Sequence, residues 1–344
     1  ISLDYLAHLL LLFLALTLCL NVPLNIWLNK ANYRVKYFSC LHKNDLIFSP
    51  PLALWLYQNL NNYDLVHTHT IFAPLISLAH QICRIQNTPY IATPHGMLET
   101  WALSYKARKK KYYYSLLEKK ALQQASIIQT LASSEAHQVK SLGFRRSVII
   151  PNGIHHKEFT TLPSPEIFYQ RFPEARNKTS ILFLARIDPK KGLDLLAPAF
   201  AQAQQKFPNA HLIIAGPDTI SFTATAKNYF IEAGCMNAVT FTGMLTGSLK
   251  LAALAASTIY VAPSYSEGFS MSVLEGMASG LPSVITTGCN FPEAAANKVA
   301  RVVNINADDI SNALISFLSN PLAARAMGER ARQFIVILNR KHMK

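Results

Sequence analysis

The stretch of sequence that decides the fold runs from Ala262 to Pro282 and reads APSYSEGFSMSVLEGMASGLP. The apolar residues Ile259–Ala262 predict a buried strand, and the pattern at the far end of the stretch is typical of a helix. An acid, Glu267, and a glycine, Gly268, lie in the loop between them, and a second acid, Glu275, follows inside the helix. A strand that ends at such a loop and continues into a helix indicates an α/β domain with a ligand site at the loop.

This loop has the composition of a site for a phosphate and a sugar. Gly268 lets the backbone approach a ligand closely, and Phe269 follows it. Ser270 is placed to cap the helix, and the backbone amides after it can point at phosphate oxygens. A carboxylate can accept two hydrogen bonds from a vicinal diol, so one acid suits a ribose and the other a sugar ring. The alternative is a capped helix that carries exposed acids.

A second strand–loop–helix segment lies earlier, at residues 182–196, and reads LFLARIDPKKGLDLL. Its loop carries two cations, Arg186 and Lys191, and Gly192 opens the next helix. Cations beside the free N–H groups of a helix N-terminus make a good anion site, and a diphosphate is the ligand that we expect there. Taken alone, the two charges are better explained as solvated loop residues.

Short apolar runs alternate with helical patterns along the chain, as a parallel sheet with crossover helices requires. Because 344 residues fit two domains, we expect an α/β fold with two Rossmann-like, doubly wound domains that face a cleft. The expected boundaries are residues 1–155 for the first domain, 156–178 for a linker and 179–344 for the second domain. The predicted strands are Leu65–His67, Tyr90–Thr93, Ile127–Gln129, Val148–Ile150, Ile181–Leu184, His211–Ala215, Val239–Thr242, Ile259–Ala262, Ser283–Thr286 and Arg301–Val303.

Together these segments resemble the signature of the retaining glycosyltransferases of family 4, also called group 1, which have the GT-B fold. The family's E-x7-E pattern is present as Glu267 and Glu275. Other matches keep the family's order over roughly Tyr63 to Pro321. They are Pro263-Ser264, Gly280-x-Pro282, Arg186 with Lys191-Gly192, Ala215-Gly216-Pro217, Thr242-Gly243 and Ile150-Pro151-Asn152-Gly153.

The resemblance implies a role for each matched residue of a donor site. Arg186 and Lys191 would neutralise the donor diphosphate as it departs, which is the main catalytic effect we expect. Glu275 would hold the ribose hydroxyls, and Glu267 would contact the transferred sugar. The remaining donor-binding residues implied are Gly216, Gly268, Phe269 and Ser270.

Histidines in the first half bear on the reaction centre. Thr93-Pro94-His95-Gly96 resembles the family loop that brings a histidine to the transferred sugar, so His95 joins Arg186, Lys191 and Glu267 as a candidate catalytic residue. A capping or packing histidine is the alternative. His67 and His69, at i and i+2 of a strand, point to the same face but supply too few ligands for a metal. We therefore predict no metal site.

The net charge of +14 is concentrated in the first half. No nucleic-acid-binding motif accompanies it, so we exclude nucleic acid as a partner. The basic run Lys106–Lys111 and the segment before it resemble enzymes that build bacterial exopolysaccharides or lipid-linked oligosaccharides. This run suits an anionic membrane surface, and the alternative is a solvated helix face.

Both ends of the chain depart from the family pattern. The uncharged run Tyr5–Leu28 stands where the first strand and its glycine-rich loop are expected, and the first glycine of the chain is Gly96. This run is a single membrane helix, a core helix or a frameshift product, and the start of the chain reads as incomplete or aberrant. The tail Phe334–Lys344 lacks the expected aromatic-rich return helix.

The sequence thus predicts a retaining hexosyltransferase that moves a sugar from a nucleotide-diphosphate sugar to a saccharide or lipid-linked acceptor. We expect it to act in cell-surface polysaccharide synthesis, without cofactor or metal, in the cytoplasm or at the inner face of the cell membrane. Five scattered cysteines fit reduced thiols there. The alternatives are a catalytically impaired donor-binding remnant, favoured by the two ends, and a sugar-nucleotide epimerase on the same fold.

Overall fold

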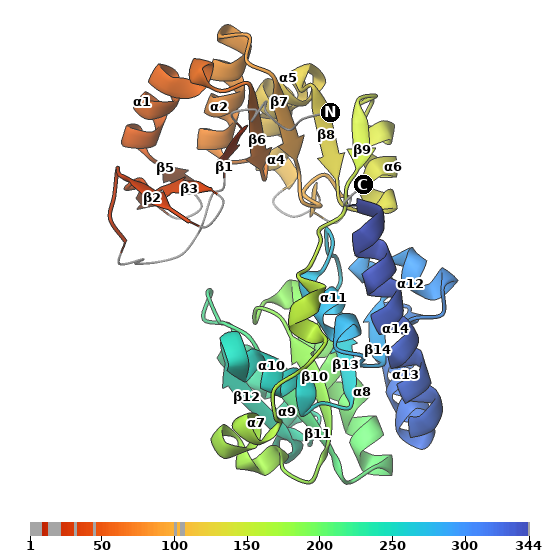
Figure 1. Cartoon of the computed structure of the whole chain (residues 1–344). Helices are drawn as coiled ribbons and strands as arrows, with labels where there is room; N and C mark the ends of the chain where they lie inside the picture. Colours follow the sequence, from red (N-terminus) through yellow and green to blue (C-terminus); the bar gives the residue numbers. More distant parts are fainter. Residues whose placement is uncertain are drawn as a thin grey trace. The chain divides into compact units, whose positions relative to one another are not determined.

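The computed structural model describes residues 9–12, 22–30, 33–43, 46–99, 102–103 and 107–342. The chain forms two compact units, residues 1–150 and 151–344. Each unit has a parallel central sheet with helices packed on it (Figure 1), which confirms the α/β prediction. All ten predicted strands are present, and their ends differ from the expected ones by at most two residues.

The first unit has a five-stranded parallel sheet in the order β1-β6-β7-β8-β9. Two antiparallel hairpins, β2-β3 and β4-β5, lie outside this sheet. The strands of the sheet are β1 (Leu9–Leu12), β6 (Leu65–His69), β7 (Tyr90–Thr93), β8 (Ile127–Thr130) and β9 (Ser147–Ile149). Those of the hairpins are β2 (Trp27–Asn29), β3 (Arg34–Lys36), β4 (Leu41–Lys43) and β5 (Leu46–Phe48).

Strand β1 corrects the expectation for the start of the chain. Leu9–Leu12 pairs in parallel with Leu65–Thr68 of β6, so the Tyr5–Leu28 run is not one continuous helix, and a first strand is present. A short all-apolar run has the same pattern in a buried strand and in a buried helix, and here the backbone groups of β6 satisfy it as a strand. No helix among the described residues is long and apolar enough to cross a membrane. Residues 13–21, where the glycine-rich loop was expected, lie outside the described residues.

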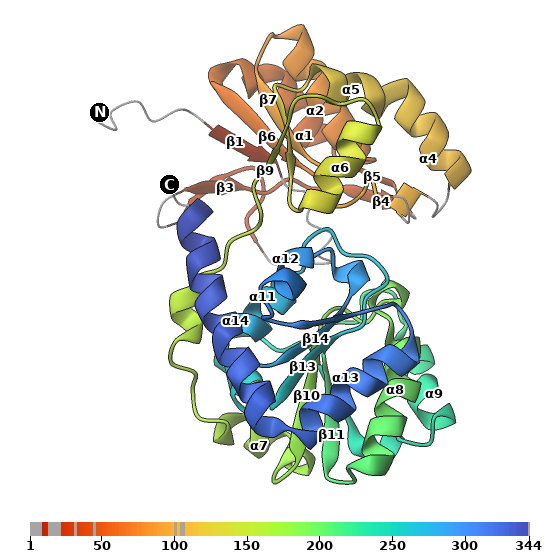
Figure 2. The same cartoon turned by 90° about the vertical axis from the view of Figure 1, so that its right-hand side faces the viewer.

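Helices on the sheet of the first unit enclose its core (Figure 2). Proline occupies the first turn of α1 and of α2, where it removes no intrahelical hydrogen bond. The helices are α1 (Pro50–Asn59), α2 (Pro74–Ile85), α4 (Ala107–Tyr113), α5 (Lys119–Gln124) and α6 (Ser133–Ser141), with a 3-10 turn η1 (Leu60–Asn62) and a π-helical turn η2 (Tyr114–Glu118). Val66, Ala79, Cys83, Tyr90 and Ile128 form the centre of the core.

One histidine of α2, His80, lies fully buried in this core. Its ring stacks on Tyr90, with the ring centroids 4.8 Å apart. The Thr68 hydroxyl donates to the Ile91 carbonyl, so at its 2.8 Å contact with His80 it accepts from Nε2–H. The other nitrogen, Nδ1, has no partner among the described residues. Burial lowers the pKa of His80 to about 4, because a proton on Nδ1 would be a buried, unpaired donor.

We expect acid to destabilise the first unit through His80. The unfolded chain binds this proton with a pKa near 6.5 and the folded chain only with a pKa near 4. The contribution of neutral His80 to the free energy of unfolding is therefore complete above pH 6.5 and is lost as the pH falls towards 4. The loss is on the order of 3 kcal/mol. All three tryptophans, Trp27, Trp55 and Trp101, lie in the first unit, so denaturant unfolding followed by tryptophan fluorescence reports this unit.

A His80→Gln variant is the matched control, because glutamine can donate to Thr68 but does not titrate. Its stability should fall less steeply than that of the wild type between pH 6.5 and 4. Equal slopes in the two proteins would show that His80 does not cause the acid sensitivity.

The second unit has a six-stranded parallel sheet in the order β12-β11-β10-β13-β14-β15. Numbered from its own start, this order is 3-2-1-4-5-6, the doubly wound order of dinucleotide-binding domains. The strands are β10 (Thr179–Leu184), β11 (Ala210–Ala215), β12 (Val239–Gly243), β13 (Ile259–Ala262), β14 (Ser283–Thr286) and β15 (Arg301–Val303).

Helices cover both faces of this sheet. One face carries α8, α9 and α13, and the other carries α7, α10 and α11 with part of α14. The helices are α7 (Glu166–Arg171), α8 (Leu193–Lys206), α9 (Thr223–Glu232), α10 (Gly247–Ala255), α11 (Met271–Ala278), α12 (Pro292–Ala296), α13 (Ala307–Ser319) and α14 (Pro321–His342). The 3-10 turns are η3 (His156–Phe159), η4 (Pro173–Ala175), η5 (Pro189–Lys191), η6 (Met236–Ala238) and η7 (Thr287–Cys289).

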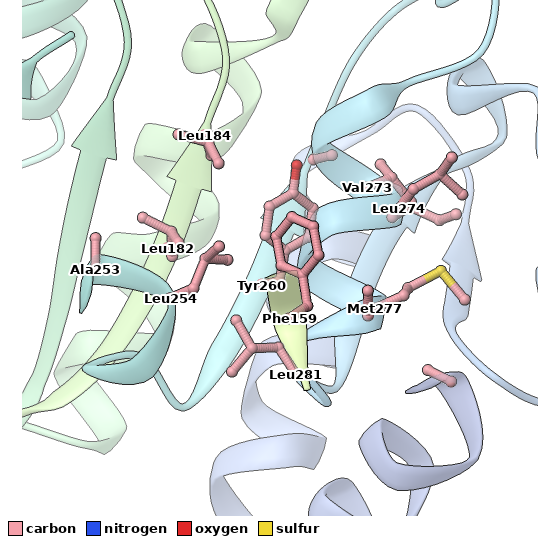
Figure 3. Close-up of a cluster of buried hydrophobic side chains, with 14 of the residues drawn as sticks. Phe159, Leu182, Leu184, Ala253, Leu254, Tyr260, Val273, Leu274, Met277 and Leu281 are labelled. Carbon is pink, nitrogen blue, oxygen red and sulfur yellow. The ribbon is translucent and has the colours of Figure 1, made fainter. Parts of the chain in front are cut away.

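The core on the α11 face is centred on Tyr260, whose ring lies among leucines of the strands and helices (Figure 3). The Tyr260 hydroxyl donates to Ser272 Oγ of α11 at 2.9 Å. A Cβ at Gly276 would lie 2.7 Å from the Tyr260 ring, so glycine lets α11 pack directly on this ring. α11, which follows the Glu267 loop, is thereby fixed on the sheet.

Residues 156–178, expected as a linker, belong to the second unit. Phe159 and Phe168 are almost fully buried in the α11-face core, and α7 packs on α10. The polar, proline-containing composition of this stretch gave no indication that two of its aromatic residues are buried.

The tail continues a long helix, α14, in which Phe334 is the one Phe, Tyr or Trp residue. α14 has 22 residues, and the side chain of Ile335 is buried in the α11-face core. Gly328 permits the packing, because a Cβ there would lie 2.0 Å from the carbonyl oxygen of Gly280.

Candidate functional site

The predicted cation loop and acid loop follow neighbouring strands of the second unit. β10 and β13 pair in parallel, and the strand order reverses direction between them. In doubly wound sheets, ligands bind beyond the carboxyl ends of the strands at this switch point. The loop after β10 carries Arg186 and Lys191, and the loop after β13 carries Glu267. The fold thus brings together residues that are about 80 positions apart in the sequence.

Backbone contacts join the two loops. Gly192 has φ +72°, and a Cβ there would lie 2.1 Å from the carbonyl oxygen of Pro263. The N–H of Tyr265 donates to the carbonyl of Lys190 at 2.9 Å. Only glycine allows this approach without moving backbone atoms of the neighbouring loop, so Gly192 determines how closely the loops pack.

At the centre of the site, Lys191 and Glu267 form an ion pair. The Lys191 Nζ atom lies 2.6 Å from Glu267 Oε1, and each side chain is 12% exposed. Ser264 Oγ donates to the same carboxylate oxygen at 2.7 Å. The backbone of Glu267 is held as well, since its N–H donates to Gly288 and its carbonyl accepts from Asn290 Nδ2. A cation and an acid are therefore fixed side by side at the switch point.

The second acid, Glu275, lies on α11 and pairs with a lysine of α10. Lys250 Nζ is 2.8 Å from Glu275 Oε1, and both groups are partly exposed. This pair is separate from the pair of Lys191 and Glu267. One carboxylate therefore lies in the loop and the other on the helix that follows it.

Arg186 lies in the loop after β10 and is exposed. No carboxylate of the described residues forms an ion pair with it, whereas Lys191 is already paired. Its positive charge is thus available to an anion at the switch point.

At Gly216 the backbone of a neighbouring loop leaves no room for a side chain. A Cβ at this residue would lie 1.7 Å from the carbonyl oxygen of Ala185, next to Arg186. The N–H of Gly216 donates to the carbonyl of Gly243 at 2.9 Å. Gly216 therefore shapes the loop that carries Arg186.

The start of α11 differs from expectation in one respect. Ser270 is the N-cap residue, but its side chain makes no capping hydrogen bond, and its Oγ lies 3.2 Å from Ser272 Oγ. Gly268 and Phe269 precede it, and the Phe269 ring packs edge-on against Phe291 with the ring centroids 5.2 Å apart. With no serine hydroxyl bound to them, the first amides of α11 are open to another acceptor.

In the first unit, His95 lies just after β7, and its ring lies beside that of His69, which in turn lies beside that of His67. The His69 Nδ1 and His95 Nε2 atoms are 2.8 Å apart, and the rings of His67 and His69 are 4.4 Å apart. Burial lowers the pKa of all three imidazoles, and the neighbouring rings lower that of His69 further, to about 3. The cluster is therefore neutral at pH 7.

The backbone at His95 is held by an acid that the sequence did not reveal. His95 has φ +55°, unusual for a residue with a side chain, and Gly96 follows with φ +74°. The carboxylate of Glu135 is fully buried, and its oxygens accept the N–H groups of Gly96 at 2.6 Å and of Leu131 at 2.7 Å. Burial raises the pKa of Glu135.

Sequence reasoning missed Lys250, Ser264, Asn290 and Glu135. Ser264 stood in the quoted motif and was available, but the other three lie in helices or turns without any local sign of a distant partner. Among the described residues, no group of three or more His, Cys, Asp or Glu side chains is arranged to hold a metal ion.

Two family models match the chain, one for each unit. The model described as "Glycosyl transferases group 1" matches residues 166–334. The model described as "Glycosyltransferase Family 4" matches residues 19–158. The first match contains the switch-point residues, and the second contains the histidine cluster.

The sequence identity between this chain and individual relatives is low. The chain is 25% identical over 325 residues to the uncharacterised glycosyltransferase YqgM of Bacillus subtilis, covering 87% of this chain and 85% of the relative. It is 26% identical over 289 residues to a phosphatidyl-myo-inositol mannosyltransferase of Propionibacterium freudenreichii, covering 82% of this chain and 68% of the relative.

Solved structures show the same fold. The Anabaena protein HepE, solved in complex with UDP and glucose, has a TM-score of 0.72 at 19% identity, with 85% of this chain and 80% of HepE covered. A sucrose-phosphate synthase of Thermosynechococcus elongatus has a TM-score of 0.73 at 20% identity, with 92% and 82% covered. At these identities the likeness concerns the fold alone.

Proposed function

Because this chain belongs to the group 1 glycosyltransferases and has their GT-B fold, we propose that it transfers a sugar from a nucleotide-diphosphate sugar with retention of configuration. The acceptor is a saccharide or a lipid-linked saccharide, as in cell-surface polysaccharide synthesis. The family membership gives the class of reaction. The donor site, the retention and the acceptor class are the proposal.

The observation that carries the proposal is the pair of Lys191 and Glu267 at the switch point. A lysine beside an acid, with Arg186 exposed on the same loop, suits a ligand that combines a diphosphate with a sugar. Incoming phosphate oxygens can take hydrogen bonds from Lys191, which frees Glu267 to accept from sugar hydroxyls. HepE, a structural neighbour, was solved with UDP and glucose, which supports a donor of this chemistry.

Transfer with retention requires one bond to break, one bond to form on the same face of the sugar, and one proton to move. The bond between the anomeric carbon and the diphosphate oxygen breaks, and the acceptor oxygen bonds to the same face of the sugar. The acceptor proton passes to the departing phosphate oxygen. Arg186, Lys191 and the first amides of α11 stabilise the negative charge that develops on the diphosphate, while Glu275 holds the ribose.

The alternative of a catalytically impaired remnant loses one of its supports. It drew on an apparently missing first strand, whereas β1 lies in the sheet. The expected glycine-rich loop falls on residues 13–21, which lie outside the described residues. The epimerase alternative differs from transfer in its product, because an epimerase changes the donor sugar without any acceptor.

The test is a transfer assay with a panel of nucleotide sugars and saccharide or lipid-linked acceptors, in the presence of EDTA. We expect multiple turnovers and an anomeric configuration, read by NMR coupling constants, that equals that of the donor. An inverted product would disprove the retaining mechanism. A changed sugar in the absence of acceptor would establish epimerase activity instead.

We further propose that α4, η2 and α5 dock on an anionic membrane, the surface on which lipid-linked acceptors reside. The expected basic run contributes only in part. Lys110 Nζ donates to the Ala102 carbonyl and lies over the Phe72 ring, so it faces its own unit, and Lys106 and Lys109 carry no described side chain. Three apolar side chains are exposed instead, Tyr112 by 72%, Leu116 by 74% and Leu117 by 45%. The exposed basic residues around them are Arg108, Lys111, Lys119 and Lys120.

Vesicle binding tests this surface. We expect the chain to bind vesicles with anionic phospholipid better than neutral ones and to be released by salt, because exposed charges are screened within about 10 Å at 0.1 M. Leu116→Ser with Leu117→Ser should weaken binding at least about tenfold, since leucine insertion adds apolar burial. Leu322→Ser, at an exposed leucine of α14, is the control and should have no effect. Equal binding to neutral and anionic vesicles would contradict the proposal.

A further inference from the structure

Three imidazoles form a row at the ends of β6 and β7 in the first unit. The strand alternation points His67 and His69 to one face, while Val66 and Thr68 are buried on the other. The ring centroids of His67 and His69 are 4.4 Å apart, and those of His69 and His95 are 5.1 Å apart. His67 Nε2 lies 2.8 Å from Thr93 Oγ1, which ties the row to β7.

The ring of His95 is held at one of its two nitrogens. His95 Nε2 lies 2.8 Å from His69 Nδ1, so one of these atoms donates and the other accepts. Rotation of the His95 ring away from His69 would break this bond. The backbone beneath is fixed as well, because Glu135 binds the N–H of Gly96 in the left-handed turn.

Since one nitrogen is engaged, the other is the atom that a ligand can reach. Among the described residues, no hydrogen bond involves His95 Nδ1. We propose that His69 is a positioning residue, which by binding Nε2 of His95 leaves Nδ1 as the nitrogen that His95 offers to the transferred sugar. This inference rests on the proposed function and on the expectation, implied by the family resemblance, that His95 contacts the transferred sugar.

The direction of the shared hydrogen bond decides what Nδ1 can do. If His69 Nδ1–H donates, the neutral His95 ring carries its proton on Nδ1 and donates to a sugar oxygen. If His95 Nε2–H donates, Nδ1 has a lone pair and accepts from a sugar hydroxyl. In both cases His69 assigns the tautomer of His95, and the sugar meets a ring that needs no reorientation.

The chain contains its own references for reading these tautomers by ¹⁵N NMR of the histidine rings. His137 Nδ1 faces the Ser133 carbonyl and therefore carries a proton, whereas His80 carries its proton on Nε2. In the wild type we expect His95 to show one tautomer. In His69→Phe, which keeps a flat ring but has no nitrogen, the signals of His95 should move towards a tautomer mixture while those of His137 and His80 stay in place.

Kinetics provide the second readout. His69→Phe should lower kcat about 10- to 100-fold, because a displaced contact at the reacting sugar costs about that much. KM for the nucleotide sugar should change less, since the phosphate-binding residues lie in the second unit. His69→Asn places an amide near the position of Nδ1, so it should restore most of the lost kcat and a single His95 tautomer. Thermal unfolding followed by tryptophan fluorescence checks that the first unit of each variant is folded.

The two readouts separate failure of this inference from failure of the proposed function. Unchanged His95 signals in a folded His69→Phe variant would overturn the inference, whatever the activity. A kcat loss in His69→Phe that His69→Asn does not restore would also overturn it. If the wild type transfers no sugar, the proposed function fails, and the NMR comparison still decides whether His69 sets the tautomer of His95.

Discussion

Replacing Lys191 by methionine is expected to lower kcat/KM for sugar transfer about 100- to 1,000-fold, the range for loss of one fixed group that stabilises charge in a transition state. Methionine keeps the length of the side chain but has no charge to offer the departing diphosphate. The change also removes the partner of Glu267, which would remain as a carboxylate that is 12% exposed. That uncompensated charge repels the diphosphate as well, so donor affinity should fall together with kcat. Steady-state kinetics with the identified donor measure both effects.

Lys206→Met is the matched control for Lys191→Met. Lys206 is an exposed lysine at the last turn of α8, the helix that Gly192 opens, so it lies one helix length from the switch point. This variant should transfer sugar at the wild-type rate. If Lys191→Met were also active at the wild-type rate, the ion pair at the switch point would have no part in catalysis.

Replacing Gly192 by alanine should destabilise the second unit by about 2–5 kcal/mol, the sum of a left-handed backbone strain and an overpacked contact. The new Cβ would lie 2.1 Å from the Pro263 carbonyl oxygen, and backbone atoms cannot rotate away as a flexible side chain can. The two loops must therefore separate, and donor affinity should fall. Calorimetric unfolding measures the stability. Tryptophan fluorescence, which reports the first unit, should be unchanged.

Gly234→Ala separates the two causes. Gly234 also has φ +72°, but a Cβ there would meet nothing within 4 Å. This variant should lose only the strain, about 1–2 kcal/mol, and keep its donor affinity. Equal losses in the two variants would show that the contact with Pro263 is unimportant.

The sequence predicted the strands well because each is a short apolar run between turn residues, a local signal. β13 and β14 have the predicted ends, and Gly192 caps α8 as expected. The order of the strands is a different matter. That Arg186 and Glu267 reach the same switch point depends on β13 pairing with β10, which the resemblance implied and no local pattern shows.

Predictions were wrong where the local composition gave no sign that a side chain is buried or that a segment pairs with a distant one. The run Tyr5–Leu28 was too apolar to distinguish a strand from a helix, and β1 became visible only through its pairing with β6. The polar stretch 156–178 gave no sign that Phe168 is in the core. Lys250 was missed because its partner, Glu275, lies 25 residues away on another helix.

For the candidate site, too, local patterns could be read from the sequence and long-range contacts could not. Arg186, Lys191, Glu267 and Glu275 could be named as candidates because they lie in loops and at helix starts with a recognisable spacing, and their roles stay predictions. The capping role of Ser270 was wrong, since its hydroxyl binds no helix amide. The row of three histidines could not be foreseen, because it needs the register of β6 against β7 and the left-handed turn at His95.

We expect the switch point of the second unit to bind a nucleoside diphosphate through fixed cations. Isothermal titration calorimetry of UDP, GDP and ADP into the chain, with EDTA present, tests it most directly. One of these nucleotides should bind with one-to-one stoichiometry. Lys191→Met should weaken this binding severely, and Lys206→Met should leave it unchanged. Binding of equal strength to the wild type and to Lys191→Met, or no binding of any nucleotide, would show that the switch point is not a nucleotide site.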